Sequence, residues 1–136
     1  MKMYVKEEAK DYQVTSARDI VADCQDMVSA DQEMMMCYTL NSDNKVIEKD
    51  IISIGAVQAD NPDMKIIFRR VLRHGGTGLI LVHNHPSGNT EPSNADREFT
   101  KGVAQVCGVI GMRFLDHIVI GDGYCSLAER GWIPNN

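Results

Sequence analysis

The sequence predicts an α/β domain with three layers (α-β-α) and a mixed sheet. Apolar runs separated by a short polar turn indicate a β-hairpin, and three stretches with apolar residues every three or four positions indicate amphipathic helices. Further apolar runs follow the second and third of these helices, so helices and strands alternate along the chain. The length of 136 residues, 43% of them hydrophobic, favours one domain with a substantial core. We assign this domain to residues 15–136 and an N-terminal extension to residues 1–14.

The first helix is expected shortly after the extension. Residues 1–13 are polar with scattered apolar positions, which leaves open either an edge strand or a loose segment. Thr15 or Ser16 suits the N-cap position, and apolar residues recur at helical spacing as far as Val28. We therefore expect one amphipathic helix that ends near residues 29–31.

A β-hairpin is expected next. Residues 34–40 form an apolar run that begins with three methionines, and adaptable core packing is the simplest role for these side chains. Residues 41–44 are typical of a turn, and residues 45–54 predict the second strand of the hairpin.

The second helix has clear signals at both ends. Asn61 and Pro62 suit its N-cap and first position, while Gly75 and Gly76 suit its end. Its outer face carries five basic side chains: Lys65, Arg69, Arg70, Arg73 and His74. Such a face is either solvated or a patch for an acidic partner, including the phosphate backbone of a nucleic acid.

The most informative stretch begins with the apolar run at residues 78–82, which predicts a buried strand. His83 and His85 follow it, and residues two apart in a strand project to the same face. Their Cα atoms would lie about 6.6 Å apart, a workable separation for two imidazoles that bind one ion. Pro86 has no N–H for a sheet hydrogen bond, so the strand should end there.

Ser93 and Asp96 complete this group of residues. Ser93 suits the N-cap of the third helix, and Asp96 falls in its first turn. The loop at residues 87–92 is short enough to bring that turn back over the end of the strand. Two neutral imidazoles and one carboxylate leave a fourth position for water, as in catalytic rather than structural zinc sites. The alternative is a carboxylate that only complements the helix dipole, beside two ordinary polar histidines.

The C-terminal part predicts an apolar strand at residues 116–120, a hairpin turn at residues 121–123 and a short final strand at residues 124–127. His117 begins the first of these strands. We expect it to support the metal centre rather than to bind the ion, because a fourth protein ligand would close the site.

Composition excludes several classes of protein. The net charge of −5 gives no general signal for nucleic acid, and no apolar run approaches the length of about 20 residues that a membrane span needs. The N-terminus lacks the apolar core of a signal peptide, so we expect a cytoplasmic protein. The four cysteines contain no C-x-x-C pair and predict packed, reduced thiols: Cys24, Cys37, Cys107 and Cys125.

The pattern around the two histidines resembles a known motif. His83-x-His85-Pro86 followed by Ser93-x-x-Asp96, with ten residues between His85 and Asp96, resembles the JAMM (MPN+) metalloprotease motif. Three strings, at residues 79–88, 115–123 and 126–131, resemble the bacterial RadC branch of that superfamily, and the resemblance extends over nearly the whole chain. It implies the JAB/MPN architecture, which is similar to that of cytidine deaminases.

The resemblance also implies a zinc-dependent hydrolase that cleaves a peptide or isopeptide bond in a protein or peptide substrate. His83, His85 and Asp96 would bind Zn2+, and Ser93 would donate a hydrogen bond to the oxyanion. Glu33 stands where JAMM proteins carry the glutamate that moves the proton of the attacking water. From the residues alone, Glu33 would be an ordinary solvated charge.

Two alternatives remain open. RadC-like proteins are traditionally associated with DNA repair, which suggests a DNA-binding accessory protein. The branch often carries an N-terminal helix-hairpin-helix module, for which we see no room before Ala17, and residues 63–66 depart from the His-Pro-Arg-Glu common in relatives. The other alternative is a metal-binding scaffold without catalysis. The substrate and the oligomeric state are left undetermined.

Overall fold

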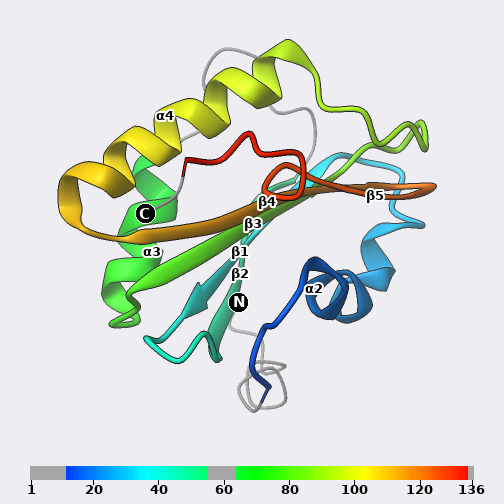
Figure 1. Ribbon diagram of the computed structural model, residues 1–136. Helices are drawn as coiled ribbons and strands as arrows, with labels where there is room; N and C mark the ends of the chain where they lie inside the picture. Colours follow the sequence, from blue (N-terminus) through cyan, green and yellow to red (C-terminus); the bar gives the residue numbers. More distant parts are fainter. Residues whose placement is uncertain (1–11, 55–63, 135–136) are drawn as a thin grey trace.

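The computed structural model describes residues 12–54 and 64–134 of the chain, which form a five-stranded sheet with helices on both faces (Figure 1). The strands are β1 (Met34–Leu40), β2 (Val46–Ile54), β3 (Gly78–Asn84), β4 (Arg113–Gly121) and β5 (Gly123–Ser126). Their order in the sheet is β2-β1-β3-β4-β5. The pair β3 and β4 is parallel and the other pairs are antiparallel, so the sheet is mixed, as predicted.

The helices cover the two faces unequally. They are α2 (Ala17–Asp23), the 3-10 turn η1 (Gln25–Met27), α3 (Met64–Arg73) and α4 (Asn94–Ile110). In Figure 1, α2 lies on one side of the sheet and α4 on the other. The packing agrees, because α2 shares one apolar cluster with the sheet whereas α3 and α4 share a second. The three-layer α/β architecture predicted from the sequence is confirmed.

The alternation of side chains along β3 builds both layers. Ile80 and Val82 belong to the cluster on the α2 side, and Leu79 and Leu81 to the cluster on the side of α3 and α4. All four are at most 2% exposed, as expected for a strand with both faces covered. His83 continues the second set and therefore points toward the α4 side.

The first helix is shorter than the apolar spacing predicts. It ends at Asp23, Cys24 leaves the helical region with φ −123° and ψ 35°, and the chain tightens into the 3-10 turn. Cys24 and Met27 are nevertheless buried, as the predicted helix required. Apolar spacing alone does not separate one tight turn from another turn of α-helix, which explains the error.

Several other predicted elements are present, and one prediction falls on residues that the structure does not describe. The hairpin, the strand that carries His83 and the helix after Ser93 are present. The predicted cap at Asn61 and Pro62 lies outside the described residues. Within the described part of the N-terminal extension, Gln13 forms a single antiparallel bridge with Lys45, and Val14 is 8% exposed.

Two composition-based expectations can be compared with the structure. All four cysteines are free and buried, as predicted for packed thiols. None of the described helices combines the length and the apolar character needed to cross a membrane.

Candidate metal centre

The two histidines lie where β3 ends and its neighbour β4 continues. His83 is in β3, and its side chain is 1% exposed. His85 lies just past the strand, but its N–H still donates to the Ile120 carbonyl at 2.8 Å, so the alternation of side chains reaches one residue further. Both imidazoles therefore project to the same side, as the sequence predicted.

A close contact with the β4–β5 turn holds the loop after His85. The N–H of Gly88 donates to the His85 carbonyl at 2.9 Å, and the Gly88 carbonyl accepts from the N–H of Asp122 at 2.7 Å. A Cβ atom on Gly121 would lie 2.5 Å from the Gly88 oxygen, so the two chain segments approach as closely as glycine allows. The loop is thus fixed at the end nearest the histidines.

The first turn of α4 supplies the carboxylate. Ser93 is the N-cap, and its Oγ accepts from the N–H of Asp96 at 3.0 Å. In return, Asp96 Oδ2 accepts from the N–H of Ser93 at 2.9 Å, which completes a capping box. The same bonds that start the helix therefore hold the Asp96 carboxylate over the end of β3.

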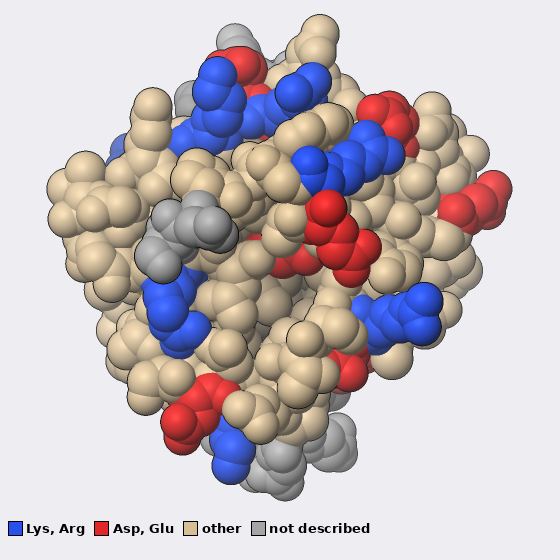
Figure 2. Space-filling model, viewed as in Figure 1, with Lys and Arg blue, Asp and Glu red and all other residues tan. Residues whose placement is uncertain are grey.

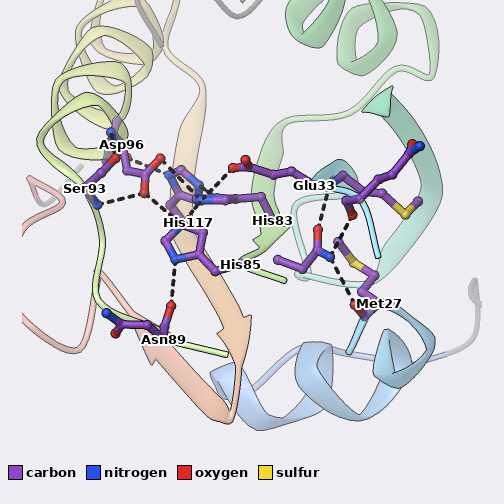
Figure 3. A network of polar contacts seen from close by, with 12 residues as sticks. Met27, Glu33, His83, His85, Asn89, Ser93, Asp96 and His117 are labelled. Carbon is purple, nitrogen blue, oxygen red and sulfur yellow. Dashed lines mark hydrogen bonds and ion pairs between the residues drawn. The ribbon is translucent and has the colours of Figure 1, made fainter. Parts of the chain in front are cut away.

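The side chains converge on one point (Figure 3). The Nε2 atoms of His83 and His85 lie 3.1 Å apart. Asp96 Oδ1 lies 3.3 Å from His83 Nε2, and Asp96 Oδ2 lies 3.2 Å from His85 Nε2. Glu33 approaches from the other side, with Oε2 at 3.9 Å from His83 Nε2. All four residues predicted for metal binding and proton transfer are thus brought together, with Glu33 the most distant.

Hydrogen bonds on the far side of each ring indicate which nitrogen carries the proton. His85 Nδ1 lies 2.7 Å from the Asn89 carbonyl oxygen, which can only accept. The Nδ1 of His85 is therefore the protonated nitrogen. In the neutral ring, Nε2 then presents a lone pair to the centre.

The tautomer of His83 follows from a longer chain of bonds. The Thr100 hydroxyl donates to the Asp96 carbonyl at 2.8 Å, so its oxygen accepts from His117 Nδ1 at 2.6 Å. His117 Nε2 must then accept from His83 Nδ1 at 2.8 Å. His83 Nε2 is left without a proton and faces His85 and Asp96. His117 thus lies behind His83, where the sequence placed a supporting group.

The centre is consequently lined by acceptors. Four acceptors face one another here: two imidazole lone pairs and two carboxylate oxygens. Each lies within 3.3 Å of another of the four, and this arrangement is repulsive unless a positive charge lies between them. A divalent cation or added protons would meet that need. The donor set of two histidine nitrogens and one carboxylate is also a common ligand set for zinc. The residues therefore fit a metal ion.

The electrostatics of the buried groups describe the centre when added protons, rather than an ion, supply the positive charge. Burial raises the pKa of Asp96, but a His83 ring that carries a second proton and the Ser93 hydrogen bonds outweigh it and hold that pKa below its usual range. Burial, reinforced by the neighbouring His83, lowers the pKa of His117 to about 3. At neutral pH Asp96 is therefore an anion and His117 is a neutral ring.

A second group of ligand-type side chains lies between β2 and α3. Glu48, Asp50 and His74 have ligand atoms within 4.8 Å of one another, as do Glu33, His83 and His85. In the second group, however, Asp50 Oδ1 accepts from Arg70 at 2.9 Å and Oδ2 lies 2.9 Å from His74 Nε2. We name these sets the histidine centre (His83, His85 and Asp96, with Glu33 beside them) and the Asp50 cluster (Glu48, Asp50, Arg70 and His74).

Two supporting residues of the histidine centre were not predicted. Thr100 lies four residues after Asp96, a spacing that places both on one face of a helix and could have indicated a link. Asn84 is the residue between the two histidines, and its side chain bonds to the main chain near Glu33. Strand alternation predicts only that Asn84 points away from the ion.

Comparisons with known proteins agree with the fold. The model of a family described as "RadC-like JAB domain" matches residues 14–132. A UPF0758 protein of Rubrobacter xylanophilus is 38% identical over 107 residues, which are 79% of this chain and 47% of the relative. UPF0758 proteins of Xanthomonas campestris and Vibrio campbellii are 42% and 43% identical over 103 residues, covering 75% of this chain and 46% of each relative. The chain thus spans about half the length of the curated relatives it matches. It belongs to the RadC-like JAB domain family.

Proposed function

We propose that this chain is a JAMM-type hydrolase that uses Zn2+ to cleave a peptide or isopeptide bond. The observation that carries the proposal is the histidine centre itself: a cluster of acceptors that calls for a cation, with a second carboxylate beside it. His83, His85 and Asp96 would hold the ion. When bound, zinc would lower the pKa of a water molecule toward ~7 and polarise the scissile carbonyl.

Glu33 is the proposed general base and acid. Its carboxylate is 29% exposed, compared with 16% for Asp96, so it borders both the centre and the solvent from which a substrate would come. It lies further from His83 Nε2 than Asp96 does, at 3.9 Å rather than 3.3 Å. In this role Glu33 accepts a proton from the attacking water and returns it to the nitrogen of the leaving amine.

Ser93 is the proposed oxyanion donor. Its Oγ already accepts the N–H of Asp96, which uses a lone pair and leaves the hydroxyl proton for another acceptor. That proton can be donated to the oxygen that becomes negative when water attacks the carbonyl. Loss of one such donor costs roughly 3–4 kcal/mol of transition-state stabilisation in other hydrolases.

Association with DNA is supported less. Of the five basic side chains expected on the outer face of α3, Arg70 and His74 both bond to Asp50. On the face shown in Figure 2, Lys and Arg side chains alternate with Asp and Glu and form no continuous basic surface. A salt-dependent shift of duplex DNA, abolished by replacement of Arg69 and Arg73, would restore this alternative.

The test compares three zinc-loaded proteins: the wild type, Glu33→Gln and the control Glu98→Gln. Glu98 lies on the exposed side of α4, where it pairs with Lys101. Each protein is incubated with a pool of linear peptides and a pool of lysine-linked isopeptides, and mass spectrometry identifies the products. We expect cleavage by the wild type and by Glu98→Gln, and none by Glu33→Gln at equal zinc content.

Two results would contradict the proposed function. Cleavage by Glu33→Gln at the wild-type rate would remove Glu33 from the mechanism. Failure of the zinc-loaded wild type to cleave either pool would favour the scaffold alternative, in which the ion has no catalytic role.

A further inference from the structure

Asn84 stands between the two histidines in sequence but points to the opposite face of β3. It is 1% exposed, and its side-chain oxygen and nitrogen both bond to the main chain of another segment. Its Oδ1 accepts from the N–H of Met34 at 2.6 Å, and its Nδ2 donates to the carbonyls of Gln32 at 3.1 Å and Met27 at 3.2 Å. One side chain therefore makes three hydrogen bonds, one buried and two partly buried, to residues 50 to 57 positions away in the sequence.

Two of these bonds enclose Glu33. The carbonyl of Gln32 belongs to the peptide group before Glu33, and the N–H of Met34 belongs to the one after it. Glu33 itself precedes β1, and the register between β1 and β3 is last defined by the pair Met35 and His83. The Asn84 side chain therefore connects β3 to the chain just before β1, beyond the last strand pair. This connection lies at Glu33.

The third bond fixes where this segment begins. Residues 28–33 lie outside helix and strand, and they connect η1 to β1. By donating to the carbonyl of Met27, the last residue of η1, Asn84 holds the start of the segment as well as its end. The path of the main chain that leads to Glu33 is thus anchored on both sides by a single side chain.

Asparagine suits this position because its amide combines one acceptor with two donors. Aspartate would direct an unprotonated oxygen at two carbonyl oxygens, and serine or threonine would supply only one donor. The metal ligands do not require asparagine here, because Asn84 faces away from His83 and His85. The requirement arises from the segment that carries Glu33.

We propose that Asn84 is a positioning residue for Glu33, which it holds within reach of the histidine centre without contacting the ion. This role rests on the proposed function of Glu33. It also explains how one strand serves both halves of the centre: His83 points to one face toward the ion, and Asn84 points to the other face and anchors the proton-transfer group.

The test compares Asn84→Ser with the matched variant Asn41→Ser. Asn41 also uses its side chain to hold main chain, since Oδ1 accepts from the N–H groups of Asp43 at 2.8 Å and Lys45 at 3.0 Å, but it lies in the β1–β2 turn. Both variants lose hydrogen bonds from an amide side chain to the main chain, so a general effect of such a loss should appear in both. An effect on Glu33 should appear in Asn84→Ser alone.

Two of three readouts are expected to separate the variants. Zinc affinity should remain unchanged in both, because neither residue is a ligand. With Co2+ in place of zinc, the pseudocontact shifts of the Glu33 and Met34 amides should change in Asn84→Ser and stay constant in Asn41→Ser. Where a peptide is cleaved, kcat should fall by about 100-fold in Asn84→Ser with little change in KM, the size of loss that a small misplacement produces.

The outcomes keep the two proposals distinct. Unchanged pseudocontact shifts in a folded Asn84→Ser protein, or loss of zinc affinity in that variant, would overturn the positioning role. Equal shift changes in both variants would overturn it as well. If the wild type cleaves no peptide while the shifts change in Asn84→Ser alone, the hydrolase proposal fails and the anchoring of Glu33 by Asn84 stands.

Discussion

The histidine centre and the Asp50 cluster contain similar residues but differ in charge balance. Each has carboxylates and imidazole nitrogen close enough to share an ion. In the Asp50 cluster, the Arg70 guanidinium pairs with Asp50, so a permanent cation is already present. In the histidine centre, the described residues place no Lys or Arg in an ion pair with Asp96, and its imidazoles present lone pairs.

This difference shows why residue types are a weak guide to metal sites. A carboxylate and a histidine beside an arginine form a structural ion pair, which gains little from a metal ion. The same groups without a donor repel one another and gain a great deal from one. The location of the protons therefore separates the two clusters better than ligand type or distance.

The largest effect is expected on metal affinity. Asp96→Asn removes the carboxylate that faces both imidazoles, and we expect zinc affinity to fall by more than about 100-fold, beyond the usual cost of losing a supporting group. Asp50→Asn is the matched change in the other cluster and should leave zinc affinity unaltered. Competition with a chromophoric chelator measures both. A large loss in Asp50→Asn, with none in Asp96→Asn, would reverse the assignment.

The next effect concerns the residues behind the ligands. Thr100→Val removes the hydroxyl that sets the tautomers of His117 and His83, and zinc affinity should fall by about 10–100-fold. Thr39→Val is the matched change, because Thr39 is equally buried, lies opposite Glu48 on the neighbouring strand, and has a hydroxyl with no hydrogen-bond partner among the described residues.

Thr39→Val should therefore leave zinc affinity unchanged and raise the free energy of unfolding by about 1 kcal/mol, because it removes an unsatisfied buried hydroxyl. Urea unfolding of both valine variants provides the comparison. If Thr100→Val also kept its zinc affinity, the proton assignment in the histidine centre would be wrong.

The metal-free protein should lose stability in mild acid through His117. Its pKa is about 3 in the folded chain and about 6.5 in the unfolded chain, so between these values the unfolded chain binds more protons. This contribution to stability is complete above pH 6.5 and decreases as the pH falls toward 3. The free energy of unfolding should fall by up to about 1.4 kcal/mol per pH unit from this residue.

The window from pH 6.5 to 4.5 isolates His117 from Asp96, whose own contribution is lost only below the ordinary carboxyl range. Urea titrations of the metal-free wild type and of His117→Asn across this window should give a steeper decline for the wild type. Parallel curves would mean that His117 is not held neutral.

The smallest effect is expected in the Asp50 cluster. Asp50→Asn removes the ion pair with Arg70 and the contact of a carboxylate oxygen with His74, and Arg70 is 40% exposed, so the free energy of unfolding should fall by only about 1 kcal/mol. High salt should reduce the difference between this variant and the wild type. A loss of several kcal/mol that salt leaves unchanged would show that this cluster is more than a surface ion pair.

The sequence was informative wherever a pattern is local. The strands, the capped start of α4 and the convergence of His83, His85 and Asp96 all follow from spacings of a few residues. The position of Glu33 was expected only from the resemblance to a known family, because nothing near Glu33 in the sequence indicates that it meets β3.

The rest depended on contacts between distant segments. Asn84 bonds to Met27 across 57 residues, and His117 bonds to His83 across 34. Patterns of single residues do not carry this information, because the partners are selected by the folded sheet. The early end of α2 has a different cause, since a tight turn buries Cys24 and Met27 as well as a longer helix would, and their spacing fits both.

The proposed ligand set is tested most directly by X-ray absorption spectroscopy at the zinc edge, on the wild-type protein and on Glu33→Gln loaded with one equivalent of Zn2+. We predict two imidazole ligands with the remaining scatterers oxygen, no sulfur, and spectra that are the same in the two proteins. A single imidazole, or a ligand set that changes when Glu33 is replaced, would contradict a centre held by His83, His85 and Asp96.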